Sequence, residues 1–225
     1  MTKPIIAVDG PAASGKGTLA RKLAEKLDFA YMDTGVLYRA VAFEVIDTGL
    51  SFKDKRDTID AAQNLLKKLQ NAPDPNKILS NPRLRDDDIG QGASKVAAIP
   101  EIRQILKDMQ RDFAENPGDG VKGAVLDGRD IGTVICPDAD LKLFVTAKVE
   151  VRAKRRLKEL QSKGITATYG DVLDDMLERD SRDVQRKDAP MTRADDAIVI
   201  NNSDRNAEET FEMALKIVNE RLNLQ

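Results

Sequence analysis

The sequence predicts an α/β fold with a doubly wound parallel sheet, and three observations support this. An apolar run at 5–9 leads through a glycine-rich turn into a helix-like segment. Five short apolar runs have the length and composition of buried strands. Helical patterns separate these runs, which is typical of parallel strands joined by crossovers. The expected strands are 5–9, 29–32, 124–127, 141–146 and 197–201.

The first turn, residues 10–18, has the pattern of a phosphate-binding loop, Gly-Pro-Ala-Ala-Ser-Gly-Lys-Gly-Thr. Its glycines let the backbone curl so that successive N–H groups point at an anion. The following helix adds partial positive charge, and Lys16 supplies a full charge for the β and γ phosphates of a nucleotide. Position 17 lacks the usual Ser or Thr that binds magnesium, so this role would pass to Thr18. A plain glycine turn is the alternative, which the flanking strand and helix disfavour.

The composition restricts the chemistry. The 225 residues suffice for one domain or for a core with insertions, and a net charge of -2 gives no general attraction to nucleic acid or membranes. The chain has no histidine, which excludes a His-based acid–base relay. Its single cysteine, Cys136, excludes an intrachain disulfide and is read as a small apolar residue. No apolar run approaches the ~18 residues of a membrane span, and the first strand leaves no room for a signal peptide. We therefore expect a cytoplasmic protein.

Two long excursions interrupt the expected sheet. About ninety residues separate the second and third strands, far more than a crossover helix needs. Two excursions at the carboxyl edge of such a sheet are where a second substrate and a closing lid would lie. The first has helical patterns at 36–46, 57–69, 88–98 and 100–113 and a weak turn-and-strand pattern at 78–84; the second, charged one lies between 146 and 197, and a last helix is expected at 207–222.

Polar groups follow two of the expected strands. Asp33-Thr34-Gly35 follows the second strand, and Arg39 lies one turn further on, where it suits a phosphate; a capped helix with a solvated arginine is the alternative. Asp127-Gly128-Arg129-Asp130 ends the third strand. An acidic residue there can hold a magnesium ion, and a guanidinium can bind two phosphate oxygens at once. An Asx turn with a surface ion pair is the alternative.

Basic residues gather in the second excursion. Arg179, Arg182 and Arg186, with Asp183, fall within an arc of about 100° if the segment is helical. Three guanidinium groups on one face repel one another unless an anion joins them. A solvated helix neutralised by acidic neighbours is the alternative, and for the cluster at 152–156 the two interpretations are about even. The run at 86–88 is interpreted as a helix N-terminus, since it lacks the spacing of a calcium loop.

Taken together, these motifs resemble the bacterial cytidylate (CMP) kinases, within the nucleoside monophosphate kinase group of P-loop proteins. The Ala-Ser-Lys-Val-Ala and Asp-Gly-Arg-Asp-Ile-Gly-Thr segments are the specific part of the resemblance. Two features depart from the family: Thr34 replaces a commoner serine, and the proline-rich stretch 72–84 predicts a reduced sheet in the insert. The matching segments occur in family order over nearly the whole chain, at 9–18, 33–39, 93–100 with Arg103, 127–133 and 178–186.

The resemblance implies a P-loop kinase core with a five-stranded parallel sheet flanked by helices, at about 1–34, 120–150 and 190–225. It implies a monophosphate-binding insert at about 35–119 and a mobile lid at about 151–189. The implied reaction is magnesium-dependent transfer of the ATP γ-phosphoryl group to CMP or dCMP, in pyrimidine nucleotide metabolism. We expect a monomer that binds neither nucleic acid nor a membrane.

The resemblance also implies roles for individual residues. The catalytic residues would be Lys16, Arg129, Arg179 and Arg186. ATP would be bound by Gly10, Pro11, Ala12, Ala13, Ser14, Gly15, Lys16, Gly17, Thr18 and Arg155, and magnesium by Thr18 and Asp127. The CMP phosphate or ribose would be bound by Thr34, Arg39, Arg129 and Arg186. Cytosine would be read by Ser94, Arg103 and Asp130, and the sugar by Arg179 and Asp183.

Other functions stay open on the residues alone. The nearest is a kinase for UMP, AMP or shikimate, against which the cytosine-reading set argues. A nucleotide-dependent switch or motor ATPase usually has a longer apolar strand before its acidic residue than 124–126 provides. A non-catalytic nucleotide-binding module leaves the number of arginines unexplained.

Overall fold

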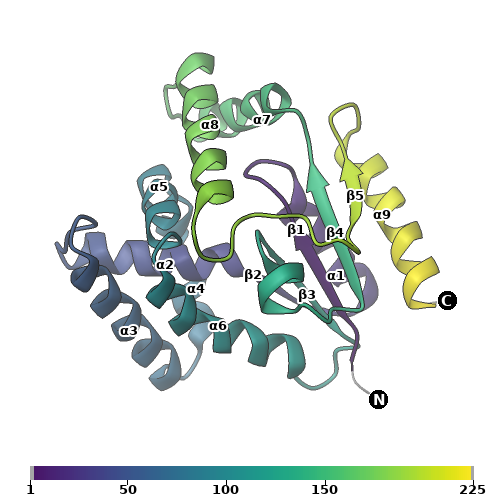
Figure 1. Cartoon of the computed structure of the whole chain (residues 1–225), viewed down its shortest axis with the longest axis horizontal. Helices are drawn as coiled ribbons and strands as arrows, with labels where there is room; N and C mark the ends of the chain where they lie inside the picture. Colours follow the sequence, from purple (N-terminus) through teal and green to yellow (C-terminus); the bar gives the residue numbers. More distant parts are fainter. Residues whose placement is uncertain (1–2, 224–225) are drawn as a thin grey trace. The chain divides into compact units, whose positions relative to one another are not determined.

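The computed structural model describes residues 3–223 (Figure 1) and confirms the predicted fold class. Its five-stranded sheet has the order β2-β3-β1-β4-β5. The central strand β1 pairs in parallel with β3 and β4, and β4 pairs in parallel with β5. Each strand begins and ends within one residue of the expected run. The strands are β1 (Ile5–Asp9), β2 (Ala30–Asp33), β3 (Ala124–Gly128), β4 (Leu141–Thr146) and β5 (Ile198–Asn201).

The described residues form two compact units. The core unit comprises 3–32 and 112–223, and the insert unit comprises 33–111. The range expected for the monophosphate-binding insert, about 35–119, overlaps most of this unit but begins two residues later and ends eight residues later. Each unit is considered by itself below.

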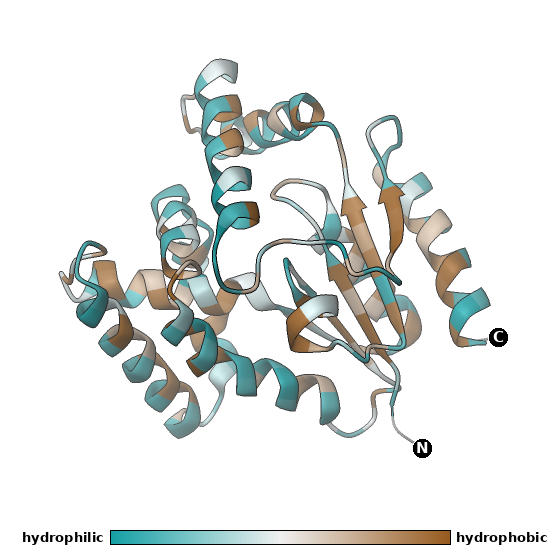
Figure 2. Ribbon diagram, in the orientation of Figure 1, coloured by the Kyte–Doolittle hydropathy of each residue, from teal (hydrophilic) through white to brown (hydrophobic). Residues whose placement is uncertain are grey.

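Apolar side chains on both faces of the sheet hold the core unit together. Along β1, Ile6 and Val8 belong to one buried cluster, and Ala7 belongs to another. This alternation follows from the two-residue period of a strand, and burial on both faces is typical of parallel sheets. The first cluster includes residues of α1 (Lys16–Leu27) and α9 (Ala207–Leu222). In Figure 2 the strands are predominantly brown, whereas α9 shows both brown and teal segments.

The second excursion folds into two helices of the core unit, α7 (Val149–Ser162) and α8 (Tyr169–Gln185). They pack on each other through a small apolar cluster of their own that includes Leu160, Val172 and Met176. A short π-helical turn, η2 (Ile131–Ile135), follows β3. These elements carry most of the polar contacts described in the next subsection.

The insert unit is helical. Its helices are α2 (Thr34–Asp47), α3 (Lys55–Asn71), α4 (Pro75–Leu79), the 3-10 turn η1 (Pro82–Arg85), α5 (Asp87–Val96) and the first part of α6 (Pro100–Glu115). The weak strand predicted at 78–84 is wrong. Asp74 and Asn81 accept hydrogen bonds from the backbone N–H groups of Asn76 and Arg83, and a proline occupies the first position of each turn. Side-chain caps followed by proline start helices, so this stretch forms two helical turns.

Candidate active site

The glycine-rich loop leaves β1 at the carboxyl edge of the sheet and enters α1. Gly10 has a φ of +149° and Gly15 a φ of +86°, values that favour glycine. A Cβ atom on Gly10 would lie 2.0 Å from the carbonyl oxygen of Val145, so no other residue fits there. Gly15 is the N-cap of α1 and provides no side-chain cap for the first amides of the helix. The predicted strand–loop–helix context is confirmed.

Asp127, near the end of β3, lies beside the start of α1. Its side chain is buried; Oδ1 accepts a hydrogen bond from the Tyr31 hydroxyl at 3.1 Å. A Cβ atom on Gly17 would lie 3.1 Å from Asp127 Oδ2, so a side chain at position 17 would press on the carboxylate. This explains the glycine after Lys16. Carboxylate and hydroxyl oxygens are the ligands that Mg²⁺ prefers, so Asp127 and Thr18 have the chemistry of magnesium ligands.

A cavity of about 200 Å³ lies beside the loop in the core unit. Arg155 of α7 donates from Nη1 to Asn202 Oδ1 at 2.9 Å and from Nη2 to the Asn202 carbonyl at 2.8 Å. Asn202 in turn donates from Nδ2 to the Ser14 carbonyl at 2.8 Å. The contacts join the loop, α7 and the segment after β5. The cavity is lined by Gly15, Thr18, Leu19, Lys22, Arg155, Asn202, Arg205, Asn206, Ala207 and Thr210.

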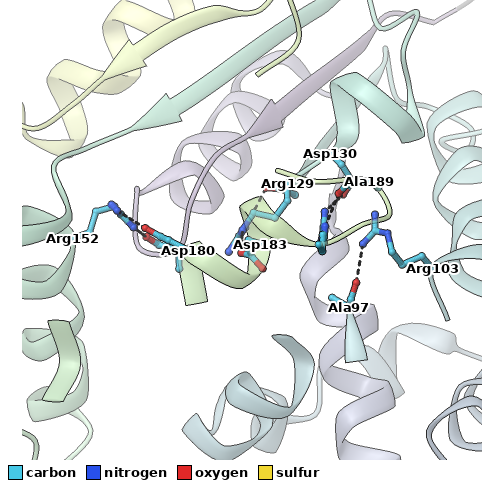
Figure 3. Close-up of polar contacts among 11 residues, drawn as sticks. Ala97, Arg103, Arg129, Asp130, Arg152, Asp180, Asp183 and Ala189 are labelled. Atoms are coloured by element: carbon cyan, nitrogen blue, oxygen red, sulfur yellow. Dashed lines mark hydrogen bonds and ion pairs between the residues drawn. The ribbon is translucent and has the colours of Figure 1, made fainter. Parts of the chain in front are cut away.

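Arg152 of α7 is buried and joins three segments of the core unit. Its Nε donates to the Ala147 carbonyl at 2.9 Å and its Nη1 to the Ala12 carbonyl at 3.2 Å. Its Nη2 lies 2.6 Å from Asp180 Oδ2 on α8 (Figure 3). Within the basic cluster at 152–156, this residue therefore does not lie on a solvated face.

Two ion pairs connect the segment after β3 to α8 and the residue that follows it (Figure 3). Arg129 Nε lies 3.0 Å from Asp183 Oδ2, and Arg186 Nη2 lies 3.3 Å from Asp130 Oδ1. Burial alone would raise the pKa of Asp183, but the charges of Arg129, Arg179 and Arg186 hold it below its ordinary value. The four charged side chains of these ion pairs, all predicted to bind the acceptor, thus lie within the core unit.

The predicted single helical face of three arginines is wrong for Arg186. Helix α8 ends at Gln185, and Arg186 has extended backbone angles, φ -60° and ψ 140°. Its Nε donates to the carbonyl oxygen of Ala189, and the Met191 N–H donates to the Asp183 carbonyl. The chain therefore turns after α8, and this turn rather than helical periodicity sets where the Arg186 guanidinium lies.

Asp9, the last residue of β1, is a buried carboxylate that the sequence analysis did not single out. Oδ1 accepts the Ile131 N–H and Oδ2 accepts the Gly132 N–H, both at 2.8 Å. Burial raises the pKa of Asp9 to about 6. The two N–H groups and the charge of Lys16 lower this pKa, and the negative charge of Asp130 raises it further.

The raised pKa of Asp9 predicts a pH-dependent stability. A rise from 3.8 to about 6 in the folded chain corresponds to roughly 3 kcal/mol. Because the folded chain binds this proton more tightly than the unfolded chain, the contribution is gained as pH falls from about 6 to about 4 and lost as it rises. Relative to Asp9→Asn, the free energy of unfolding of the unmodified protein should therefore increase by roughly 2–3 kcal/mol between pH 7 and pH 4. Urea denaturation at several pH values measures this; parallel pH profiles would contradict it.

The insert unit holds the other residues predicted to bind CMP. Thr34 is buried at the start of α2, and Arg39 Nη1 donates to the Leu84 carbonyl at 2.9 Å. Ser94 on α5 is buried, and its hydroxyl has no hydrogen-bond partner among the described residues. Arg103 on α6 is buried with its guanidinium 5.6 Å from the ring centre of Tyr38, and its Nη1 donates to the Ala97 carbonyl at 3.4 Å (Figure 3).

Several polar residues of the site were not predicted. Asn202 follows β5 directly. Ligands bind at the carboxyl ends of parallel strands, so a polar residue at this position could have been predicted to belong to the site. Tyr31 lies on β2 and contacts Asp127 only through the fold. Asp180 is one of many acidic residues on α8, and nothing in its spacing distinguishes it. The run at 86–88 starts a helix as interpreted: Asp86 is the N-cap of α5, and Asp87 and Asp88 lie in its first turn.

The family model for cytidylate kinase matches residues 6–220. The chain belongs to the cytidylate kinase family. It is 55% identical over 214 residues to the cytidylate kinase of Paramagnetospirillum magneticum, covering 95% of this chain and 97% of that one. The cytidylate kinase of Rhodospirillum rubrum is 54% identical, covering 95% and 96%.

A crystal structure of an uncharacterized protein from Eubacterium ventriosum has the same fold, with a TM-score of 0.54 at 16% identity. The alignment covers 97% of this chain and 99% of that one. Within the part of the chain that the structure describes, no helix has the length and apolar character needed to cross a membrane. Membership of the cytidylate kinase family thus rests on sequence, and the fold on the sheet order and this likeness.

Proposed function

We propose that the chain transfers the γ-phosphoryl group of ATP to CMP or dCMP, giving ADP and CDP or dCDP. The observation that carries the proposal is the family match across residues 6–220. The core unit supports it, since the phosphate loop, Asp127 and the charged groups around Asp183 belong to the same compact unit. The family resemblance gives the finer parts of the proposal: a cytoplasmic monomer acting in pyrimidine nucleotide metabolism.

The transfer asks for positioning and charge neutralisation more than for covalent chemistry by the protein. An oxygen of the CMP phosphate forms a bond to the γ-phosphorus, the bond to the bridging β–γ oxygen breaks, and ADP keeps that electron pair. Because the attacking oxygen belongs to a phosphate that is already anionic, no strong base is required. A chain without histidine can therefore carry out the reaction.

Each proposed role follows from charge. Lys16 neutralises the β and γ phosphates, and Arg129, Arg179 and Arg186 neutralise the transferred group and the acceptor. Asp127 and Thr18 would hold Mg²⁺, which would supply positive charge to the phosphate oxygens. The cavity beside the loop, with Arg155 at its edge, provides room for the adenosine part of ATP. Thr34, Arg39, Ser94 and Arg103 are the insert unit's proposed contribution to CMP binding.

A coupled assay of ADP release tests the function. With Mg-ATP as donor, CMP and dCMP should be the best acceptors among CMP, dCMP, UMP, AMP and shikimate. Product analysis should show CDP or dCDP formed in proportion to ADP. ADP release that is independent of the acceptor would indicate an ATPase instead, and a better rate with UMP, AMP or shikimate would assign a different kinase activity.

The proposed lid predicts a change in hydrogen exchange. If α7, α8 and the turn after them close on phosphates, amides in 152–188 should exchange rapidly without ligand and slow down when a bisubstrate analogue binds. Amides in the second half of α9, at 212–222, serve as the internal control and should not change. Unchanged protection across 152–188 would favour a permanently ordered, solvated helix pair over a lid.

A further inference from the structure

The buried carboxylate of Asp9 connects the phosphate loop to the segment that follows β3. Asp9 is the last residue of β1, and the phosphate loop begins at the next residue, Gly10. Its two oxygens accept the N–H groups of Ile131 and Gly132 at 2.8 Å each. These are the first two residues of the turn η2, which directly follows Arg129 and Asp130. A single side chain thus joins the loop proposed for ATP to the segment proposed for CMP.

The turn η2 has its own N-cap residue, Asp130, which would ordinarily accept these hydrogen bonds. Asp130 is the N-cap of η2, and an N-cap aspartate usually accepts hydrogen bonds from the first free amides of its own helix. Here the Asp130 side chain makes no such bond and is paired with Arg186 at 3.3 Å. Because Asp9 accepts the two amides instead, the Asp130 carboxylate is not used as the cap of η2 and pairs with Arg186.

The surrounding packing fixes this arrangement. A Cβ atom on Gly132 would lie 3.4 Å from Asp9 Oδ2 and 3.0 Å from the Lys142 side chain, so glycine lets the backbone approach the carboxylate closely. Ile131 is fully buried in the apolar cluster on that face of the sheet. Lys142 is paired with Asp196 at 2.9 Å and does not neutralise Asp9 by a direct contact. Only an ionised carboxylate presents two acceptor oxygens to two converging N–H groups; an amide presents one acceptor and a donor.

We propose that Asp9 is a positioning residue that caps η2 from outside and so holds Arg129 and Asp130 in the geometry that binds the acceptor. The inference rests on the proposed function, because it uses the assignment of these two residues to CMP. Asp9 touches neither substrate in this role and acts through the backbone of residues 131 and 132. Its removal should therefore affect the acceptor more than the donor, although the phosphate loop is its direct neighbour in sequence.

The test is Asp9→Asn, which keeps the size of the side chain and loses one of the two acceptors. A displacement of the binding groups by about 1 Å can cost about 10²-fold in rate, so kcat/KM for CMP should fall about 10- to 100-fold, mainly through KM. The KM for ATP should change by less than about threefold, since Lys16 and the loop glycines are intact. The amides of Ile131 and Gly132 should exchange at least about tenfold faster, while those of β4 stay protected. Val125→Ala, a core change on β3, is the control for destabilisation and should leave both KM values unchanged.

Several results would overturn the inference. Normal CMP kinetics in folded Asp9→Asn, or equal losses for CMP and ATP, would assign Asp9 a structural role only. If Asp9→Asn does not fold, exchange in the unmodified protein still decides, because unprotected amides at Ile131 and Gly132 would show that the cap does not form. If the unmodified protein phosphorylates no nucleoside monophosphate, the proposed function fails, whereas the amide measurement continues to test the cap by itself.

Discussion

Replacing Lys16 with alanine should lower the phosphoryl transfer rate by about 10³-fold or more while the chain still folds, by analogy with other transition-state charge contacts. Lys16 is the first residue of α1 and follows Gly15 in the loop. Its side chain is not part of either apolar cluster of the sheet, so its removal takes charge from the transferred group rather than packing from the core. Rates of CDP formation at saturating ATP and CMP, with circular dichroism as the check on folding, measure this.

Lys26→Ala is the matched control for Lys16→Ala. Lys26 lies in the last turn of the same helix and is exposed. Ten residues of helix place it about 15 Å further along the axis, so the same loss of charge should leave the rate within about twofold, as for surface changes generally. Near-normal turnover of folded Lys16→Ala would overturn the assignment of the phosphate loop.

The strands and the phosphate loop could be predicted because their signals are local. Apolar runs bounded by turns mark buried strands, and no strand end differs from the expected one by more than one residue. The loop pattern is specific because the backbone itself imposes it: Gly10 is fixed by the carbonyl of Val145, which lies 135 residues further along the chain. The sequence shows the glycine without showing its neighbour.

The errors have physical reasons. Helical periodicity continues through Arg186 in the sequence, but the chain leaves the helix after Gln185. The Asp183 carbonyl accepts from the Met191 N–H, and the Arg186 side chain donates to the Ala189 carbonyl. At 78–84 the sequence does contain the pattern for helical turns, because a polar cap followed by proline stands at the start of each turn. The cap by Asp9 could not be predicted, because its partners lie 122 and 123 residues away along the chain. They are also backbone N–H groups, which every residue except proline carries, so no residue type marks them in the sequence.

A second large effect is expected at Asp130, on the discrimination between CMP and UMP as acceptors. Cytosine has an amino donor at the position where uracil has a carbonyl acceptor. A carboxylate accepts from the donor and repels the acceptor, so CMP and dCMP should be good substrates and UMP a poor one. Asp130 is buried and paired with Arg186, and burial strengthens such discrimination because an unmatched polar group is costly to desolvate.

Asp130→Asn should therefore reduce the difference in kcat/KM between CMP and UMP. It should do so chiefly by lowering kcat/KM for CMP by about 10²-fold. An amide can turn either its oxygen or its nitrogen toward the base, so kcat/KM for UMP should change much less. Ser94→Ala should act in the same direction and more weakly, since it removes one neutral hydroxyl that has no hydrogen-bond partner among residues 3–223. Asp28→Asn removes the same charge from an exposed ion pair with Lys122 and should alter neither value. If the unmodified protein shows equal kcat/KM for CMP and UMP, Asp130 does not read the base, even where the kinase activity itself is established.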